Sequence, residues 1–111
     1  MDKFILFLFL IGTFMYCNSA SENVLWIDVR TKSEFNIQHV AGSKNIPFDK
    51  IENSLHLLPK DKTSHINVYC RSGRRSNMAK NSLSKLGFLN VTDFGGLNDL
   101  RKLDIKFITQ Q

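Results

Sequence analysis

Cysteine is scarce in this chain of 111 residues, which has only Cys17 and Cys70. Cys17 follows an apolar run at the start of the chain that is typical of an export signal, so cleavage of that segment leaves one thiol. An exported domain with a single cysteine has no internal disulfide to stabilise it. Because a lone cysteine kept in an oxidising compartment is more often reactive than structural, Cys70 is the first candidate for a functional residue.

The chain also lacks an apolar run long enough to cross a membrane. Residues 4–16 form a run of thirteen residues without charge, whereas a spanning helix needs about 20 apolar residues. Small residues follow, and a signal peptidase could cut after Ser19, Ala20 or Ser21. We therefore expect residues 1–20 to be a cleaved export signal, which leaves no stable membrane span and sends the mature chain to the periplasm. Release outside a cell with one membrane, or a lipid anchor on Cys17, are the alternatives.

Acidic residues are outnumbered, with 10 Asp and Glu against 15 Lys and Arg, so the formal net charge is +5. The basic residues do not form a stripe with interleaved aromatic residues, and we expect no nucleic-acid partner. The spacing of His39, His56 and His65 with one cysteine does not match a zinc site, and no metal or cofactor is expected. Residues 21–111 suffice for one small domain without internal repeats, which we expect to be monomeric.

The first half of this domain alternates between strand and helix signals. Residues 24–29 are almost continuously apolar, as in a strand that is buried on both faces of a parallel sheet. Thr31 and Glu34 have the spacing of a capping box, which opens a short helix. Apolar residues at helical spacing over 48–58 predict a second helix that ends before Pro59.

The second half repeats the alternation. Residues 65–69 alternate apolar and polar side chains, and residues 77–86 have apolar positions at helical spacing. A short strand over 91–94 and a last short helix from residue 97 follow, before a tail with little pattern. This order predicts an α/β domain in which helices flank both faces of a mainly parallel sheet.

Cys70 stands where a predicted strand leads into a predicted helix. The first turn of a helix has backbone N–H groups without intrahelical partners, which can point at an anion, and Gly73 allows a tight loop in which several of them converge. Three arginines add positive potential, which favours the nucleophilic thiolate over the thiol. The candidate catalytic residue is Cys70, and the candidate substrate-binding residues are Arg71, Ser72, Gly73, Arg74, Arg75 and Ser76.

Four motifs within residues 24–100 together resemble a rhodanese domain. They are DVRTKSEF at residues 28–35, HVAGSKNIP at 39–47, VYCRSGRRS at 68–76 and Gly-Gly-Leu at 95–97. The resemblance implies a thiosulfate sulfurtransferase that takes a sulfane sulfur from thiosulfate, holds it as a persulfide on its active-site cysteine, and passes it to cyanide or a thiol. No cofactor is implied.

Asp28, Arg30, Glu34 and His39 belong to the same family motifs, and we interpret them as structural. We expect a buried or half-buried ion-pair network that braces the first loop. A direct catalytic role for His39 is not expected, because an isolated histidine is usually a packing or surface residue.

Two other readings of the cysteine loop remain open. One is a non-catalytic rhodanese-like module that binds a partner or carries sulfur, since a fold alone does not fix a function. The other is a cysteine phosphatase, whose H-C-x5-R signature also places a thiolate in a basic loop at a helix start. Here Tyr69 precedes Cys70, Ser76 occupies the arginine position, and Arg75 falls one residue early, so the loop does not fit the phosphate-sized spacing.

Overall fold

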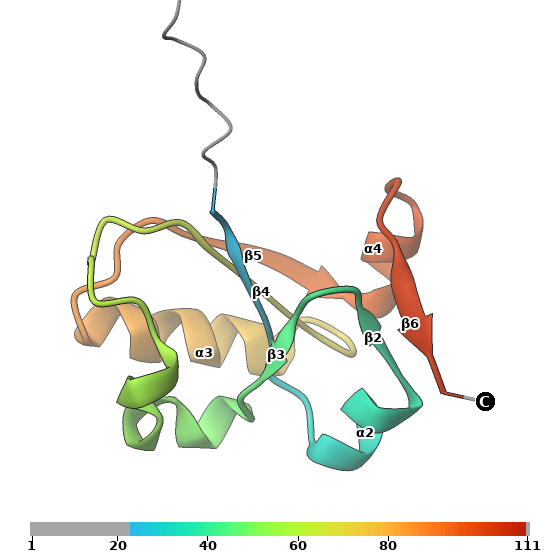
Figure 1. Ribbon diagram of the computed structural model, residues 1–111, viewed down its shortest axis with the longest axis horizontal. Helices are drawn as coiled ribbons and strands as arrows, with labels where there is room; N and C mark the ends of the chain where they lie inside the picture. The colour runs from blue at the N-terminus through green and yellow to red at the C-terminus, as the bar shows by residue number, and fades with distance from the viewer. Residues whose placement is uncertain (1–22, 111) are drawn as a thin grey trace, which may run out of the picture.

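A four-stranded parallel sheet forms the centre of the computed structural model, which describes residues 23–110 (Figure 1). The elements in chain order are β1 (Leu25–Asp28), α2 (Lys32–Ile37), β2 (Gln38–Val40), β3 (Lys44–Asn45), the 3-10 helices η2 (Phe48–Asn53) and η3 (Leu55–Leu57), β4 (Ile66–Cys70), α3 (Arg74–Lys85), β5 (Val91–Gly96), α4 (Leu97–Arg101) and β6 (Phe107–Thr109). The predicted export signal lies outside the described residues. Within 23–110, no helix has the length and apolar character needed to cross a membrane.

The sheet has the strand order β3-β1-β4-β5, and every neighbouring pair in it is parallel. The central strand β4 is buried along its whole length. Alternate side chains of a strand point to opposite faces, so Ile66, Val68 and Cys70 enter one hydrophobic cluster while Tyr69 enters another. The sheet therefore separates two cores.

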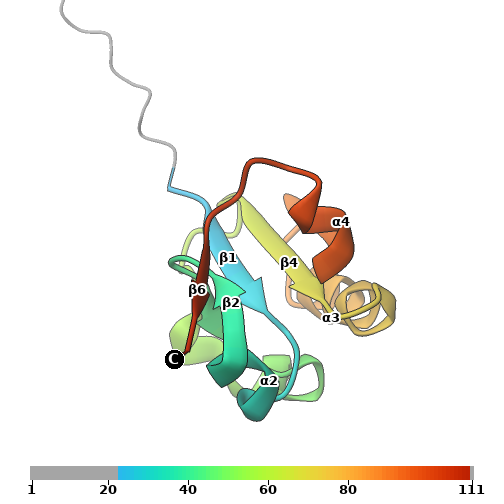
Figure 2. The same ribbon diagram turned by 90° about the vertical axis from the view of Figure 1, so that its right-hand side faces the viewer.

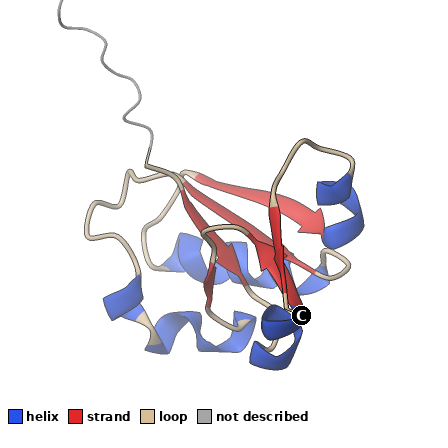
Figure 3. Cartoon of the chain, turned by 45° about the vertical axis from the view of Figure 1, so that its right-hand side comes forward, coloured by secondary structure: helices blue, strands red, loops and turns tan. Residues whose placement is uncertain are grey.

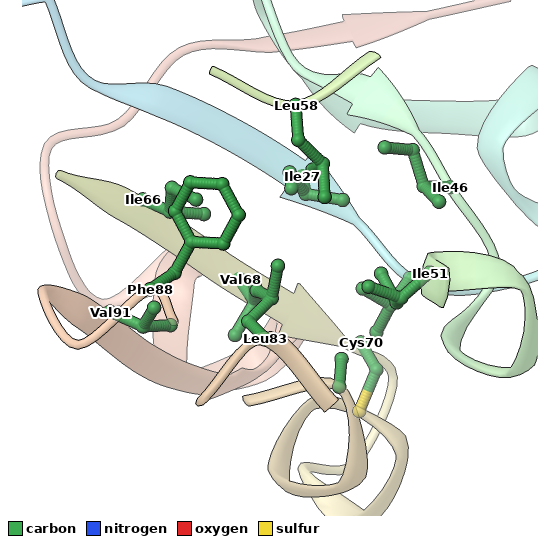
Figure 4. Close-up of a cluster of buried hydrophobic side chains, with 12 residues drawn as sticks. Ile27, Ile46, Ile51, Leu58, Ile66, Val68, Cys70, Leu83, Phe88 and Val91 are labelled. Carbon is green, nitrogen blue, oxygen red and sulfur yellow. The ribbon is translucent and has the colours of Figure 1, made fainter. Parts of the chain in front are cut away.

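Helix α3 and the 3-10 helix η2 cover the first face of the sheet. Figure 4 shows the cluster beneath them, in which Ile27 and Val68 of the sheet lie with Leu83 of α3, Ile51 of η2 and Phe88. All five side chains are at most 1% exposed. This packing fixes α3 against β4, and so fixes the loop that joins them.

The second face is covered by α4 and by a small antiparallel pair, β2 with β6. Trp26 packs on Tyr69 and Phe94 of the sheet, with ring centroids 6.1 Å and 4.9 Å away, and Leu100 of α4 closes the cluster. Figures 2 and 3 show helices on both sides of the sheet. The predicted α/β architecture is thus confirmed.

The structure differs from the predicted elements in three places. The single helix predicted over 48–58 is two short 3-10 helices, although Ile51 still faces the core. Helix α3 begins three residues before the predicted start, directly after Gly73. The tail of low information contains β6, whose Phe107 pairs with Val40 of β2.

Candidate functional site

The Cys70 sulfur lies under the loop that joins β4 to α3, and the residue is 0% exposed. Figure 4 shows the sulfur pointing toward this loop at the start of α3. The backbone N–H groups of Gly73 and Ser76 donate hydrogen bonds to Sγ, with nitrogen–sulfur distances of 2.9 Å and 3.3 Å. The Ser76 hydroxyl oxygen is 3.5 Å from Sγ. The predicted convergence of N–H groups on this sulfur is present.

The environment of the sulfur favours its ionised form. Burial acts to raise the pKa of the Cys70 thiol, but the hydrogen bond with the Ser76 side chain and those from the backbone N–H groups of Ser76, Gly73 and Ser72 outweigh it, so the pKa is lowered from its ordinary value. A hydrogen bond to the charged form stabilises that form. The loop therefore favours a thiolate at Cys70 through hydrogen bonds alone, without a neighbouring general base.

Gly73 is the residue that allows the loop to curl. Its φ angle of +104° places it in the left-handed region, and it is the N-cap of α3. A residue with a side chain is strained there, whereas glycine turns its own N–H group toward Cys70. The loop's geometry and its hydrogen bonding to sulfur thus depend on the same residue.

The double glycine at the end of β5 lies directly against the cysteine loop. Ser72 forms an isolated bridge with Gly96, and the N–H group of Leu97 donates to the Arg71 carbonyl oxygen at 3.3 Å. A Cβ on Gly96 would overlap that oxygen and lie 2.9 Å from the Arg71 carbonyl carbon. The sequence predicted a turn at these glycines. The close packing of Gly96 on the loop is a second reason why a residue without a side chain is needed there.

The three arginines that follow Cys70, one in the loop and two at the start of α3, occupy different environments. The Arg71 side chain is 75% exposed, and Arg74 is exposed as well. Arg75 instead forms a two-pronged salt bridge with Glu34 of α2, with nitrogen–oxygen distances of 2.9 Å and 3.1 Å. Arg71 and Arg74 are thus exposed, while Arg75 ties the first turn of α3 to α2.

The expected ion-pair network is present in part. Asp28 and Arg30 form a buried salt bridge at 2.6 Å, and Arg30 also donates to the Gln38 carbonyl oxygen. Glu34 pairs with Arg75 at the start of α3 rather than with Arg30. His39 is not part of the network in the described residues, because its ring stacks on Phe35 at 3.8 Å and its Nδ1 contacts the Phe35 carbonyl oxygen.

Replacing Glu34 with glutamine is expected to destabilise the fold in a pH-dependent way. The hydrogen bonds from Arg75 are the main reason that the pKa of Glu34 falls from 4.5 to about 2. A lowered folded-state pKa adds stability that is fully present above pH 4.5 and is lost as the pH falls toward 2. Allowing for solvent screening at this partly exposed site, we expect Glu34→Gln to lower the free energy of unfolding by about 1 kcal/mol at pH 7.

Urea unfolding at pH 7 and pH 3 measures this effect. Glutamine keeps an oxygen that can accept from Thr31 in the capping box, so the variant removes chiefly the charge. Glu52→Gln is the control, because Glu52 is exposed and forms no salt bridge among residues 23–110. A Glu34→Gln effect that equals the control, or that does not shrink at pH 3, would contradict the prediction.

A pocket of about 280 Å³ opens beside the cysteine loop. Its lining includes Arg71 of the loop, Glu34 and Ile37 of α2, and Leu97 and Arg101 of α4. No sequence pattern singled out Arg101, because its place in the site depends on how α4 packs. In the part of the chain that the structure describes, no group of three His, Cys, Asp or Glu residues is arranged to hold a metal ion.

The amino-acid sequence is similar to those of known sulfurtransferases. Thiosulfate sulfurtransferase PspE of Escherichia coli is 37% identical over 81 residues, which are 73% of this chain and 78% of that protein. The thiosulfate:glutathione sulfurtransferase of Saccharomyces cerevisiae is 33% identical over 89 residues, which cover 69% of this chain but only 64% of that protein.

Solved structures agree with the sequence matches. A rhodanese with anions from E. coli superposes with a TM-score of 0.71 at 33% identity, over 79% of this chain and 100% of that chain. The model of the rhodanese-like domain family matches residues 15–102. The resemblance seen in the sequence is thereby confirmed, and this chain belongs to the rhodanese-like family.

Proposed function

We propose that this protein is a thiosulfate sulfurtransferase that carries a sulfane sulfur on Cys70 and delivers it to a thiol or to cyanide. The observation that supports this most strongly is the cradle of N–H groups around the Cys70 sulfur, at 2.9 Å and 3.3 Å. The relatives named as thiosulfate sulfurtransferases support the same donor.

In the first half of the reaction, the Cys70 thiolate attacks the outer sulfur of thiosulfate. A sulfur–sulfur bond forms at Sγ while the sulfur–sulfur bond of thiosulfate breaks, and sulfite leaves with the bonding electron pair. Exposed Arg71 and Arg74 attract the dianionic donor. Cys70 is fully buried, so this proposal requires the loop over Sγ to open and admit the donor.

In the second half, an acceptor thiolate or cyanide attacks the outer sulfur of the Cys70 persulfide. The acceptor gains that sulfur, as a persulfide or as thiocyanate, and the Cys70 thiolate leaves. A leaving thiolate with a lowered pKa departs faster, and the hydrogen bonds from Gly73 and Ser76 stabilise it. Neither half needs a cofactor, a metal ion or a general base.

The sequence of residues 1–20 supports an extension of this proposal to location. We propose that the mature chain, residues 21–111, works in the periplasm as a monomer. Release outside the cell, or a lipid anchor on Cys17, are the alternatives that the same segment leaves open.

The proposal is tested by the intact mass of the protein after incubation with thiosulfate. We expect a gain of one sulfur atom, located by peptide mapping on the fragment that contains Cys70 and removed by cyanide as thiocyanate. Protein alkylated beforehand with iodoacetamide is the control and should gain nothing. No mass gain, together with hydrolysis of an aryl phosphate, would indicate a cysteine phosphatase, and neither activity would indicate a non-catalytic module.

A further inference from the structure

The pocket beside the cysteine loop is built at the carboxyl ends of three neighbouring strands. Arg30 follows β1, Arg71 follows β4, and Leu97 and Arg101 belong to the helix that follows β5. This edge of a parallel sheet is where ligands of α/β proteins bind. Arg71 is the next residue after Cys70 and lines the pocket, so the pocket adjoins the loop that covers the sulfur.

Ion pairs inside and around the pocket leave it with excess positive charge. Arg30 is neutralised by Asp28 at 2.6 Å, and Glu34 by Arg75 at 2.9 Å. Arg71 reaches Glu34 only at 3.8 Å, the outer limit of a salt bridge. Among residues 23–110, no carboxylate forms a salt bridge with Arg101. The positive charges of Arg71 and Arg101, which both line the pocket, are therefore not fully neutralised by carboxylates.

Arg101 is held in place by neutral groups. Its guanidinium donates to the side-chain oxygen of Gln38 and to the Asn98 oxygen at 3.4 Å. It also lies over the Phe107 ring, with its central carbon 5.6 Å from the ring centroid. These contacts orient the cation but do not cancel its charge, and an oriented guanidinium suits a carboxylate.

Part of the pocket wall is apolar, beside the polar side chains of Glu34, Gln38 and Asn98, and the pocket's volume is small. Ile37 is 66% exposed and lines the pocket together with Leu97. These two apolar side chains suit a ligand with a short carbon chain better than an inorganic anion. The volume of about 280 Å³ lies at the lower end of the range of roughly 300–1,000 Å³ for ligand sites, which favours a short molecule.

We propose that this pocket binds the acceptor, and that the acceptor is a small thiol that bears one or more carboxylates, recognised by Arg101 with Arg71. The inference rests on the sulfur transfer proposed above. Arg101 holds the carboxylate while the acceptor's thiolate attacks the outer sulfur of the Cys70 persulfide and Cys70 leaves as the thiolate. Arg101 is thus a specificity-determining residue for the second half of the reaction, and thiosulfate does not use it.

The test compares two acceptors of similar size, the dicarboxylate mercaptosuccinate and the neutral 1-thioglycerol, in wild type and Arg101→Gln. We expect the variant to lower kcat/KM for mercaptosuccinate about tenfold, as for the loss of one charge-assisted hydrogen bond near the surface, and to change the value for 1-thioglycerol less than about twofold. The rate of persulfide formation from thiosulfate, followed by intact mass, should not change. Each variant is compared with wild type on the same acceptor, so differences in thiol reactivity cancel.

Lys102→Gln is the matched control. Lys102 is the next residue, it is exposed, and its replacement removes the same charge without touching the pocket lining. An equal loss with both acceptors, an equal loss in Lys102→Gln, or slower loading from thiosulfate would overturn the assignment. The last result would make the pocket the donor site.

A binding measurement keeps this inference separate from the proposed activity. Succinate lacks the thiol, so its titration into unmodified protein, followed by amide chemical shifts of residues 97–101, needs no turnover. We expect saturable shifts in wild type and in Lys102→Gln, and none in Arg101→Gln. If wild type forms no persulfide but binds succinate in this way, the sulfur transfer fails while the anion pocket stands. No saturable shift in wild type would overturn the pocket.

Discussion

A Cys70→Ser variant is expected to lose sulfur transfer from thiosulfate to any acceptor by more than about 10³-fold, since removing a covalent nucleophile has effects of at least this size. The hydroxyl of serine is far less acidic than a thiol and forms no persulfide. The N–H groups of Gly73 and Ser76 that lower the pKa of Cys70 would remain, and they cannot ionise a serine to a useful extent. Steady-state production of thiocyanate measures the loss.

The variant should still fold, which separates loss of chemistry from loss of structure. Serine is close to cysteine in size, and its hydroxyl would meet the N–H groups that now bond Sγ. We expect its free energy of unfolding to lie within about 1 kcal/mol of wild type. Cys17→Ser is the matched control in the full chain, because Cys17 lies in the predicted export signal, and it should keep full activity. Activity retained by Cys70→Ser, or lost in Cys17→Ser, would contradict the assignment.

The fold was largely predictable because its signals are local. The capping box of Thr31 and Glu34 forms as its spacing predicted, and the alternation before Cys70 predicted the strand that is present as β4, although β4 is buried on both faces. Strong periodicity and cap residues depend only on neighbours in sequence. The same locality predicted a cysteine at a strand end and a helix start, which is the core of the candidate site.

Elements that depend on distant partners were missed or altered. The strand β6 has three residues and no pattern of its own, and it exists because it pairs with β2 about seventy residues earlier. The spacing of Phe48 and Ile51 fits either an α-helix or a 3-10 turn, and packing against α3 accompanies the shorter form. Tertiary contacts decide such cases, and a single sequence does not contain them.

The same limit applies within the site. The sequence grouped Arg75 with the substrate-binding arginines, since all three adjoin Cys70. Its salt bridge with Glu34 joins residues 41 positions apart, which no local pattern indicates. Arg101 entered the site only through the placement of α4 after β5. The positive charge that follows Cys70 is thus divided between Arg75, which is paired with Glu34, and Arg71 and Arg74, which are exposed.

Replacing Gly96 with alanine is expected to lower kcat/KM for thiosulfate about 100-fold, because the added methyl group would displace the cysteine loop. The new Cβ would overlap the Arg71 carbonyl oxygen and lie 3.0 Å from the Ser72 Cα atom. These are backbone atoms that cannot rotate away, so the loop or β5 must move. A displacement of about 1 Å in a positioned catalytic group can cost 10²-fold. We expect overpacking to lower the free energy of unfolding by about 2 kcal/mol as well.

A second glycine variant isolates the effect of this contact from the general cost of replacing a glycine. Gly42 has a φ angle of +83° and no atom within 4 Å of a built Cβ, so Gly42→Ala should cost about 1 kcal/mol of stability through backbone strain alone. Because Gly42 does not line the pocket beside the cysteine loop and its built Cβ meets no atom of that loop, the activity of Gly42→Ala should equal that of wild type. Urea unfolding and the loading rate from thiosulfate, measured on both variants, give the comparison.

The loss of activity expected in Gly96→Ala is steric, because the φ angle of −102° at Gly96 suits alanine without strain. Full activity in Gly96→Ala would show that the cysteine loop tolerates the methyl group. It would contradict the prediction that close packing on Gly96 holds this loop in place.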